Sequence, residues 1–310
     1  MLWSDIGQES QGGFIDTSTG AFSAAPRSVL VGDSTTGRTR TPDQPYLYGL
    51  GASEPTSAQA SYDAPQQRWL PVPREFVSPD GSSYAYTYIQ PGPLQGVHLV
   101  DVKTGSDRLI PGTLGDTDPR GFHYWVVAFQ PEGIYVTRVN QLGGGGLLLL
   151  DPGTGALRQV STDATGGYMF VAGRQGWWTL PSPDLNAASD PYVYHQPLTG
   201  VAGQHAETWF QRPGFRMFVL GVNTTGQAVV MAQSRLSDEL WLLGTPSSSD
   251  QISSVPAPTG LEILPFKTAV ADAGGWWIGS SAGVFYASGS KLQQVSTTPA
   301  VVVGGCQPPM

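Results

Sequence analysis

The chain of 310 residues carries 16 Lys or Arg against 24 Asp or Glu, which gives a formal net charge of −8 at pH 7. A nucleic-acid-binding surface must be basic to displace counterions, and this chain has no run of Lys or Arg, so we expect no nucleic-acid partner. The single cysteine, Cys306, excludes a disulfide within the chain. No apolar stretch approaches the ~18 residues of a membrane helix, so we expect no transmembrane segment.

The composition indicates an all-β fold. Gly (40) and Pro (26) are abundant and only 13% of residues are charged, which suits many turns between short strands better than long solvated helices. The opening MLWSDIGQES lacks the basic and apolar regions of a signal peptide. Two cellular locations fit the sequence. Scarce Lys, few charges and much Ser, Thr, Gly, Gln and Pro favour an exported bacterial protein whose leader is absent from this chain, and the alternative is a cytoplasmic protein.

Three short strands are predicted at the N-terminus, over Leu2–Ile6, Gly13–Asp16 and Ala21–Ser23. A tight turn at Thr19–Gly20 joins the last two, because Gly readily adopts the positive φ that such a turn requires.

The segment 27–67 is the least regular part of the chain. It is rich in Ser, Thr, Gly, Pro and Ala, and only Ser28–Val31 and Tyr46–Leu50 are apolar enough to order. An insertion of this length in a compact domain is commonly either functional or without fixed structure. Two interpretations stay open: passive or disordered surface chain, or a loop that covers a site or binds a partner.

A repeated pattern follows, and it is clearest from Glu75 to Ile110. An apolar run, the turn Ser78–Gly81, a second run, a loop, a third run, a turn ending in Thr104–Gly105 and a fourth run succeed one another. Four short strands at a period near fifty residues are typical of a β-propeller blade. The pattern predicts five blades, at 73–111, 124–160, 167–211, 215–253 and 268–295.

One apolar run, Ala300–Val303, remains at the C-terminus. Together with the three N-terminal strands it would make a sixth blade that closes the ring and removes the open edge of the array. We therefore predict a single β-propeller domain over 1–310, with six blades of four antiparallel strands closed by N- and C-terminal strands and an insertion at 27–67. Seven blades are the alternative, because the insertion could contain another.

The residues FVSPDGSSYAYTY and VHLVDVKTGSDRLI, within Phe76–Ile110, resemble the repeat of the TolB-like, WD-type β-propellers. Gly275–Tyr286, reading GWWIGSSAGVFY, resembles the blade motif of the propellers attached to two-component regulators. Both resemblances imply a propeller used for protein contact or sensing. Neither carries a catalytic residue over to this chain.

Motifs with catalytic or metal-binding chemistry are weak. Gly279–Gly283 fits the nucleophile-elbow pattern, but strands flank it on both sides, so we interpret it as a hairpin turn. Gly143–Gly146 lacks the Lys and the helix of a phosphate loop, so we expect a flexible connection between strands. The four histidines show no zinc-binding spacing. We predict no catalytic residue, no metal and no cofactor.

Tryptophan pairs recur at Trp177–Trp178 and Trp276–Trp277, each just after a turn between the first two strands of a blade. We expect the two pairs to be equivalent and to pack in the core, since adjacent strand residues point to opposite faces.

Turn lengths distinguish the two ends of the predicted blades. The turns between strands one and two and between strands three and four are uniformly short, whereas the other connections are long and varied, at 27–67, 89–96, 112–123, 140–146, 181–191 and 246–266. Loops on rigid scaffolds carry function, so we expect any ligand at the long-loop face, around the central channel. The candidate ligand-binding residues there are Asp116, Asp118, Arg120, His123, Tyr124, Arg138, Asn140, Asp184, Asp190, Arg212, Arg235 and Asp238.

These observations favour a non-enzymatic, monomeric binding or scaffold protein that recognises a protein or carbohydrate partner. The alternative is a propeller-type lyase or glycoside hydrolase. That alternative predicts two carboxylates, or a His and a carboxylate, within about 10 Å of each other in a pocket at the channel mouth.

Overall fold

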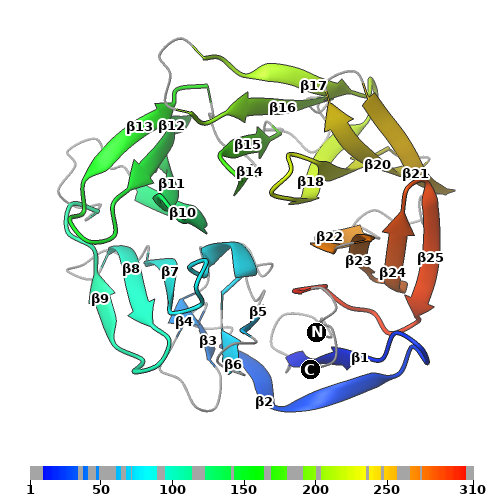
Figure 1. Cartoon of the computed structure of the whole chain (residues 1–310), viewed down its shortest axis with the longest axis horizontal. Helices are drawn as coiled ribbons and strands as arrows, with labels where there is room; N and C mark the ends of the chain where they lie inside the picture. Colours follow the sequence, from blue (N-terminus) through cyan, green and yellow to red (C-terminus); the bar gives the residue numbers. More distant parts are fainter. Residues whose placement is uncertain are drawn as a thin grey trace. The chain divides into compact units, whose positions relative to one another are not determined.

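The computed structural model describes residues 10–33, 38–40, 47–48, 61–63, 68–70, 72–88, 95–113, 123–140, 143–163, 169–179, 191–199, 204–234, 237–245, 248–256, 266–272 and 274–304. The fold is all-β, as predicted, and is built from antiparallel sheets (Figure 1). Two compact units compose it. Unit 1 comprises 1–14 and 24–165, and unit 2 comprises 15–23 and 166–310. No helix in the described parts is long and apolar enough to cross a membrane.

Unit 1 contains a four-stranded sheet at each end of its sequence and two smaller sheets between them. The strands in chain order are β1 (Ser10–Ile15), β2 (Phe22–Asp33), β3 (Arg38–Arg40), β4 (Leu47–Tyr48), β5 (Ser61–Asp63), β6 (Arg68–Leu70), β7 (Ser83–Tyr88), β8 (Gly96–Asp101), β9 (Asp107–Leu109), β10 (His123–Gln130), β11 (Gly133–Asn140), β12 (Gly143–Leu150) and β13 (Leu157–Ser161). The sheets are β1–β4, β5–β6, β7–β9 and β10–β13, each with its strands in sequence order.

Unit 2 contains three four-stranded sheets of the same up-and-down order. Their strands are β14 (Met169–Ala172), β15 (Gln175–Trp178), β16 (Tyr192–Pro197), β17 (Glu207–Gln211), β18 (Arg216–Val222), β19 (Ala228–Gln233), β20 (Ser237–Thr245), β21 (Ser248–Pro256), β22 (Phe266–Asp272), β23 (Gly275–Ser280), β24 (Gly283–Ser288) and β25 (Lys291–Ser296). This order within each sheet is the one expected of a propeller blade. The blade-type fold is confirmed, while the number of blades stays a prediction.

The first predicted blade, 73–111, differs in its opening strand. Pro73 begins a short 3-10 turn, η2 (Arg74–Phe76), so the expected strand is reduced to a single bridge between Val77 and Tyr84. The other four predicted blades coincide with the sheets β10–β13, β14–β17, β18–β21 and β22–β25 to within a few residues.

The predicted terminal strands are partly wrong. β2 and β4 overlap both apolar stretches of the segment 27–67, and they join β1 and β3 in one sheet. Ala300–Val303 is not a strand. Its amides bond irregularly, Ala300 to the carbonyl of Ser280 and Val302 to the hydroxyl of Thr268, so no ladder forms. Leu2–Ile6 lies outside the described residues.

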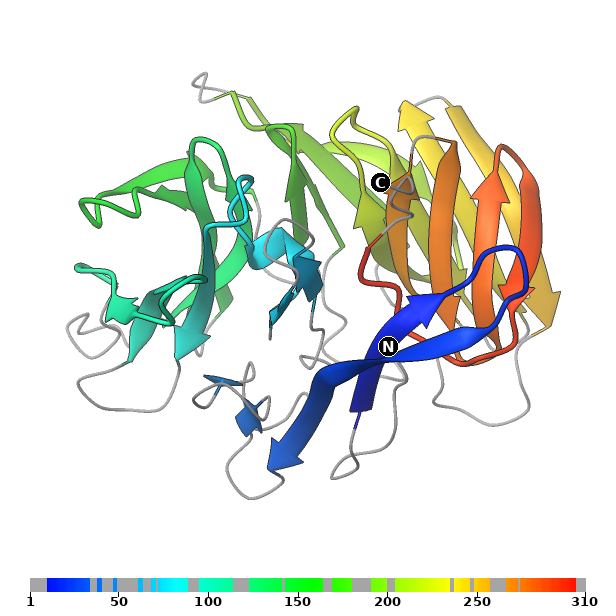
Figure 2. The same ribbon diagram turned by 60° about the horizontal axis from the view of Figure 1, so that its bottom comes forward.

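Inner strands such as β18 and β19 are buried on both faces, which explains their nearly continuous apolar sequences. In unit 2, β19 reads AVVMAQ: Val229 and Met231 enter a core shared with β22 and β23, whereas Ala228, Val230 and Ala232 enter a core with Trp177. Figure 2 shows the sheets β18–β21 and β22–β25 stacked on each other in this unit.

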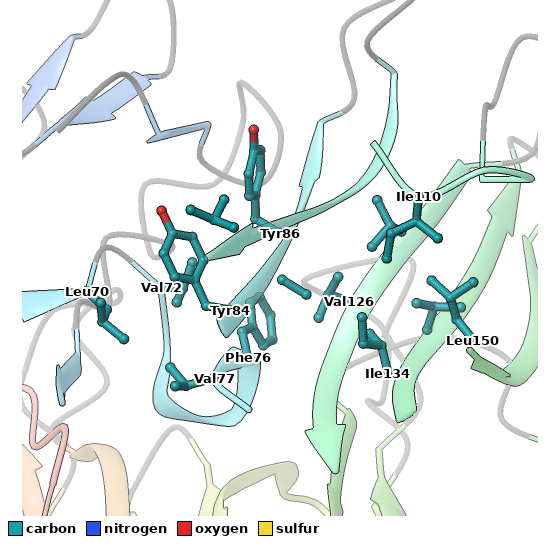
Figure 3. Close-up of a cluster of buried hydrophobic side chains, with 14 of the residues drawn as sticks. Leu70, Val72, Phe76, Val77, Tyr84, Tyr86, Ile110, Val126, Ile134 and Leu150 are labelled. Atoms are coloured by element: carbon teal, nitrogen blue, oxygen red, sulfur yellow. The ribbon is translucent and has the colours of Figure 1, made fainter. Parts of the chain in front are cut away.

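The core of unit 1 lies between the sheets β7–β9 and β10–β13. Phe76 and Tyr84 meet Val126, Ile134 and other buried residues of the neighbouring sheet (Figure 3).

The tryptophan pairs are both largely buried, but they are offset by one position. Register places Ala172 opposite Gln175 and Asp272 opposite Gly275. Counting from these turns, Trp177 is equivalent to Trp277, not to Trp276. The prediction that the two Trp-Trp pairs are equivalent is therefore wrong by one residue.

The difference in loop length between the two ends is weaker than predicted. Gly143 and Gly144 pair with Asn140 and Val139, so the expected loop at 140–146 is a hairpin. Likewise β21 occupies 248–256 of the expected loop at 246–266. At the other end, the connection between β16 and β17 spans 198–206 and is not short.

Candidate functional site

The structure describes half of the predicted ligand-binding residues. Six lie outside the described residues: Asp116, Asp118, Arg120, Asp184, Asp190 and Arg235. In unit 1, His123 begins β10 and Asn140 ends β11, at the same end of their sheet, and Tyr124 and Arg138 form a cross-strand pair. Arg212 and Asp238 belong to unit 2.

Arg212 forms the best-defined polar contact of unit 2. It follows β17 in the connection to β18. Its Nε donates to Glu239 Oε2 at 2.8 Å and its Nη2 donates to Glu239 Oε1 at 2.7 Å, which is a bidentate ion pair. The Arg212 side chain is 40% exposed and that of Glu239 is 7% exposed. The pair therefore fixes a cation at the surface on a buried carboxylate.

The Arg212 guanidinium lies over two aromatic rings. Its carbon lies 4.8 Å from the centre of the Phe215 ring and 5.7 Å from that of Trp241. The Trp241 indole donates to Glu239 Oε2 at 3.0 Å, and its ring lies 5.0 Å from Phe210. We call these five residues, Phe210, Arg212, Phe215, Glu239 and Trp241, the Arg212 cluster.

The cluster satisfies its carboxylate more fully than its cation. Glu239 accepts three hydrogen bonds, and those from Arg212 lower its pKa most, so it is ionised at pH 7. A guanidinium has five N–H groups, and two bond to Glu239. Within the described part of the chain, the remaining N–H groups of Arg212 have no partner, so a ligand can reach rigidly held donors.

Asp238 lies on the opposite face of β20 and is almost completely buried. Burial raises the pKa of its carboxyl, and the amide of Gln233, its register partner, offsets part of this effect. A buried acid with a raised pKa is a frequent feature of functional sites. Because adjacent strand residues point to opposite faces, the Asp238 side chain is separate from the Arg212 cluster.

Sequence reasoning identified Arg212 but missed Glu239, Phe215 and Trp241. The signal was present in the strand Glu239-Leu240-Trp241, where residues two apart share a face. The pairing across two sheets was not readable, since it depends on how β17 approaches β20.

Replacing Arg212 with Lys is expected to lower the free energy of unfolding by about 1 kcal/mol, because an ammonium cannot form the bidentate pair. Urea denaturation followed by tryptophan fluorescence measures the change. Arg174→Lys, in the turn at the other end of the sheet β14–β17, is the control and should leave stability near that of the wild type. Equal stability of both variants would show that the Arg212 pair contributes nothing.

A second polar group lies in unit 1. Asp107 accepts hydrogen bonds from Tyr86 OH at 2.6 Å and from His98 Nδ1 at 3.0 Å, and the Tyr86 and His98 rings stack 4.9 Å apart. Burial raises the pKa of Asp107, but the bonds from His98 and Tyr86 lower it more, and the pKa lies below its usual value. Asp107 begins β9, beside the Thr104–Gly105 turn, at the end of the sheet opposite to the predicted binding face.

Asp107→Asn is expected to lower the free energy of unfolding by about 1 kcal/mol, because the amide cannot accept both bonds as an ionised carboxylate does. Asp250→Asn on β21, where the side chain is exposed, is the matched control. A thermal melt in which both variants match the wild type would contradict a stabilising role for the Tyr86–Asp107–His98 group.

Among the residues that the structure describes, no group of three or more His, Cys, Asp or Glu side chains is arranged to hold a metal ion.

No family model matches the chain, and no curated protein sequence matches it. Solved structures with similar folds include an oligogalacturonate lyase from Vibrio parahaemolyticus, with 10% identity over 72% of this chain and 64% of that one, at a TM-score of 0.46. Another is an oligogalacturonate lyase in complex with manganese, with 12% identity, coverage of 89% and 84%, and a TM-score of 0.48. A third is the AtxE2 isopeptidase, with 12% identity, coverage of 94% and 53%, and a TM-score of 0.35. The chain thus spans about two thirds of the first of these proteins, and its function must be inferred from its own side chains.

Proposed function

We propose that this protein is a non-enzymatic β-propeller that binds a protein or glycan partner, or serves as a scaffold for one. Its contact surface is the end of the sheets where strand two connects to strand three and where one sheet connects to the next. The observation that carries the proposal is the half-exposed guanidinium of Arg212, held on buried Glu239 between aromatic rings.

The position of Arg212 supports this choice of surface. Arg212 lies in the connection between the sheets β14–β17 and β18–β21, and Glu239 lies near the start of β20. Both positions belong to the end of the sheets where the sequence predicts ligand binding. Surface loops held by rigid sheets are common binding elements.

The chemistry of the cluster favours a partner with oxygen acceptors. Fixed guanidinium N–H groups bind carboxylates and hydroxyl oxygens, and the bidentate pair reduces the entropy lost when such a partner is bound. Arg with flanking aromatic residues is also enriched among the residues that dominate protein interfaces. An acidic peptide and an acidic sugar both fit this chemistry.

We also propose that the protein is monomeric and lies outside the cytoplasm. The composition supports the location, with few Lys, 13% charged residues and abundant Ser, Thr, Gly and Gln.

A binding panel tests the proposal. Acidic and neutral oligosaccharides and acidic peptides are titrated against the protein, with thermal shift as the screen and calorimetry as the measure of affinity. We expect an acidic ligand to bind, and Arg212→Lys to weaken binding about tenfold through loss of the fixed fork. Arg174→Lys is the matched control and should bind as the wild type does.

Two results would overturn the proposal. If the wild type and Arg212→Lys bound every ligand with equal affinity, the Arg212 cluster would not be the binding site. Turnover of any oligosaccharide in the panel, detected as new reducing ends or unsaturated products, would make the protein an enzyme.

A further inference from the structure

The sheet β14–β17 buries three ring nitrogens that lack a hydrogen-bond partner in the described structure. They are Trp177 Nε1, His195 Nδ1 and Trp209 Nε1. Trp177 is completely buried and His195 is 5% exposed, while Trp209 is partly exposed although its Nε1 is buried. Buried polar groups without partners are rare in native proteins, so three in one sheet require an explanation.

The three rings form one cluster. The three rings contact one another in a triangle: the centroid of the His195 ring lies 3.9 Å from that of Trp209 and 4.7 Å from that of Trp177, and the two indoles are 4.5 Å apart. The strand pairing explains this arrangement. Trp177 is the register partner of His195, and Trp209 occupies the irregular position of β17 beside them.

A fourth side chain fixes the proton of His195. Gln175 Oε1 lies 2.7 Å from His195 Nε2. A carboxamide oxygen only accepts hydrogen bonds, so Nε2 carries the proton and Nδ1 presents a bare lone pair. Burial lowers the pKa of His195 to about 4, which keeps the ring neutral at pH 7.

The cluster therefore presents one acceptor, His195 Nδ1, and two donors, the indole N–H groups of Trp177 and Trp209. A hydroxyl oxygen complements this set, because it accepts two hydrogen bonds while its own hydrogen is donated. An anion has no hydrogen to give to Nδ1. A metal ion on Nδ1 would be repelled by the two N–H dipoles.

We propose that Trp177, His195 and Trp209 bind a hydroxyl oxygen, which accepts from both indoles and donates to His195 Nδ1. The oxygen belongs either to a bound water molecule or to an alcohol group of a saccharide that enters beside the partly exposed Trp209. Waters that bridge two to four buried polar groups are an ordinary part of protein structure. This site shares no residue with the Arg212 cluster and does not depend on the proposed function.

Nuclear magnetic resonance of protein labelled with ¹⁵N in its indoles tests the site in the intact wild-type chain. We expect the indole protons of Trp177 and Trp209 to show cross-peaks at the water frequency and the downfield shift of hydrogen-bonded N–H groups. Trp209→Phe and Trp177→Phe assign the two signals. Trp241 and Trp277, whose indoles donate to carboxylates, supply reference shifts for bonded indoles.

A saccharide titration separates the two sources of the oxygen. Persistence of the water cross-peaks in saturating oligosaccharide assigns the oxygen to a resident water. Their replacement by cross-peaks to sugar protons assigns it to a ligand hydroxyl. Indole shifts of free N–H groups, with neither water nor sugar cross-peaks and no oxygen density between the rings in a high-resolution crystal structure, would overturn the site.

Discussion

Acidification from pH 7 to pH 4 is expected to remove about 3 kcal/mol from the free energy of unfolding through His195 alone. In the folded protein burial lowers the pKa of His195 from 6.5 to about 4. In the unfolded chain the ring titrates near 6.5, so between pH 6.5 and 4 the unfolded state binds more protons than the native state. Stability is therefore fully present above pH 6.5 and falls as the pH drops toward 4, by about 1.4 kcal/mol for each pH unit.

Urea denaturation at half-unit pH intervals measures this dependence, and His195→Gln isolates it. We expect the variant to lose most of the slope between pH 6.5 and 4. Asp107 and Glu239, with lowered pKa values, also lose their contribution to stability as the pH falls below about 5, and buried Asp238 with its raised pKa acts in the opposite direction. Subtraction of the variant curve from the wild-type curve removes these contributions.

His205→Gln is the matched control, because His205 precedes β17, the strand that pairs with the β16 strand of His195, and the His205 side chain is exposed. We expect this variant to keep the wild-type slope. A His195→Gln protein with an unchanged slope would contradict the burial of a neutral His195 in the sheet β14–β17.

The sequence predicted the parts of the fold that depend on neighbouring residues. Turns such as Ser78–Gly81 and Thr104–Gly105 require a small set of residues in a fixed order, so they mark the hairpins directly. Contacts between sheets have no such local code. Glu239 is an unremarkable acid in a strand until β17 brings Arg212 to it.

His195 illustrates the same limit. In the sequence it is one of four histidines without a metal-binding pattern. Its neutral state follows from the Trp177 and Trp209 rings that surround it, and these come from the strands on either side. Only four of the twelve predicted ligand-binding side chains are described, at Tyr124, Arg138, Arg212 and Asp238, and convergence of the twelve at one face stays a prediction.

Gly20→Ala is expected to lower the free energy of unfolding by about 3 kcal/mol, well beyond the effect of the same change at Gly105. Each glycine ends a turn, and the two turns have the same hydrogen-bond pattern. In each turn the Gly amide donates to the carbonyl of an Asp, Asp16 or Asp101, whose carboxylate in turn accepts from the amide of the intervening Thr. Their φ angles are +71° and +70°, so any side chain carries the same local strain at both positions, about 1 kcal/mol.

The surroundings of the two glycines differ. A Cβ on Gly105 would meet nothing within 4 Å, whereas on Gly20 it would lie 2.3 Å from the carbonyl oxygen of Val295. The Gly20 carbonyl also accepts a hydrogen bond of 2.7 Å from the hydroxyl of Ser296. Within unit 2, the turn at 15–23 is thus docked on β25, which joins residues near both ends of the chain.

Gly155→Ala supplies a positive control in unit 1, because its Cβ would lie 2.1 Å from the carbonyl oxygen of Pro111. We expect the loss in urea denaturation to be about 1 kcal/mol for Gly105→Ala and about 3 kcal/mol for Gly20→Ala and Gly155→Ala. If Gly20→Ala behaved like Gly105→Ala while Gly155→Ala stayed severe, the N-terminal turn would not be docked on β25 in solution. A severe loss at Gly20 would instead show that the turn at 15–23 packs against β25 in solution, because the loss at Gly105 accounts for the local strain.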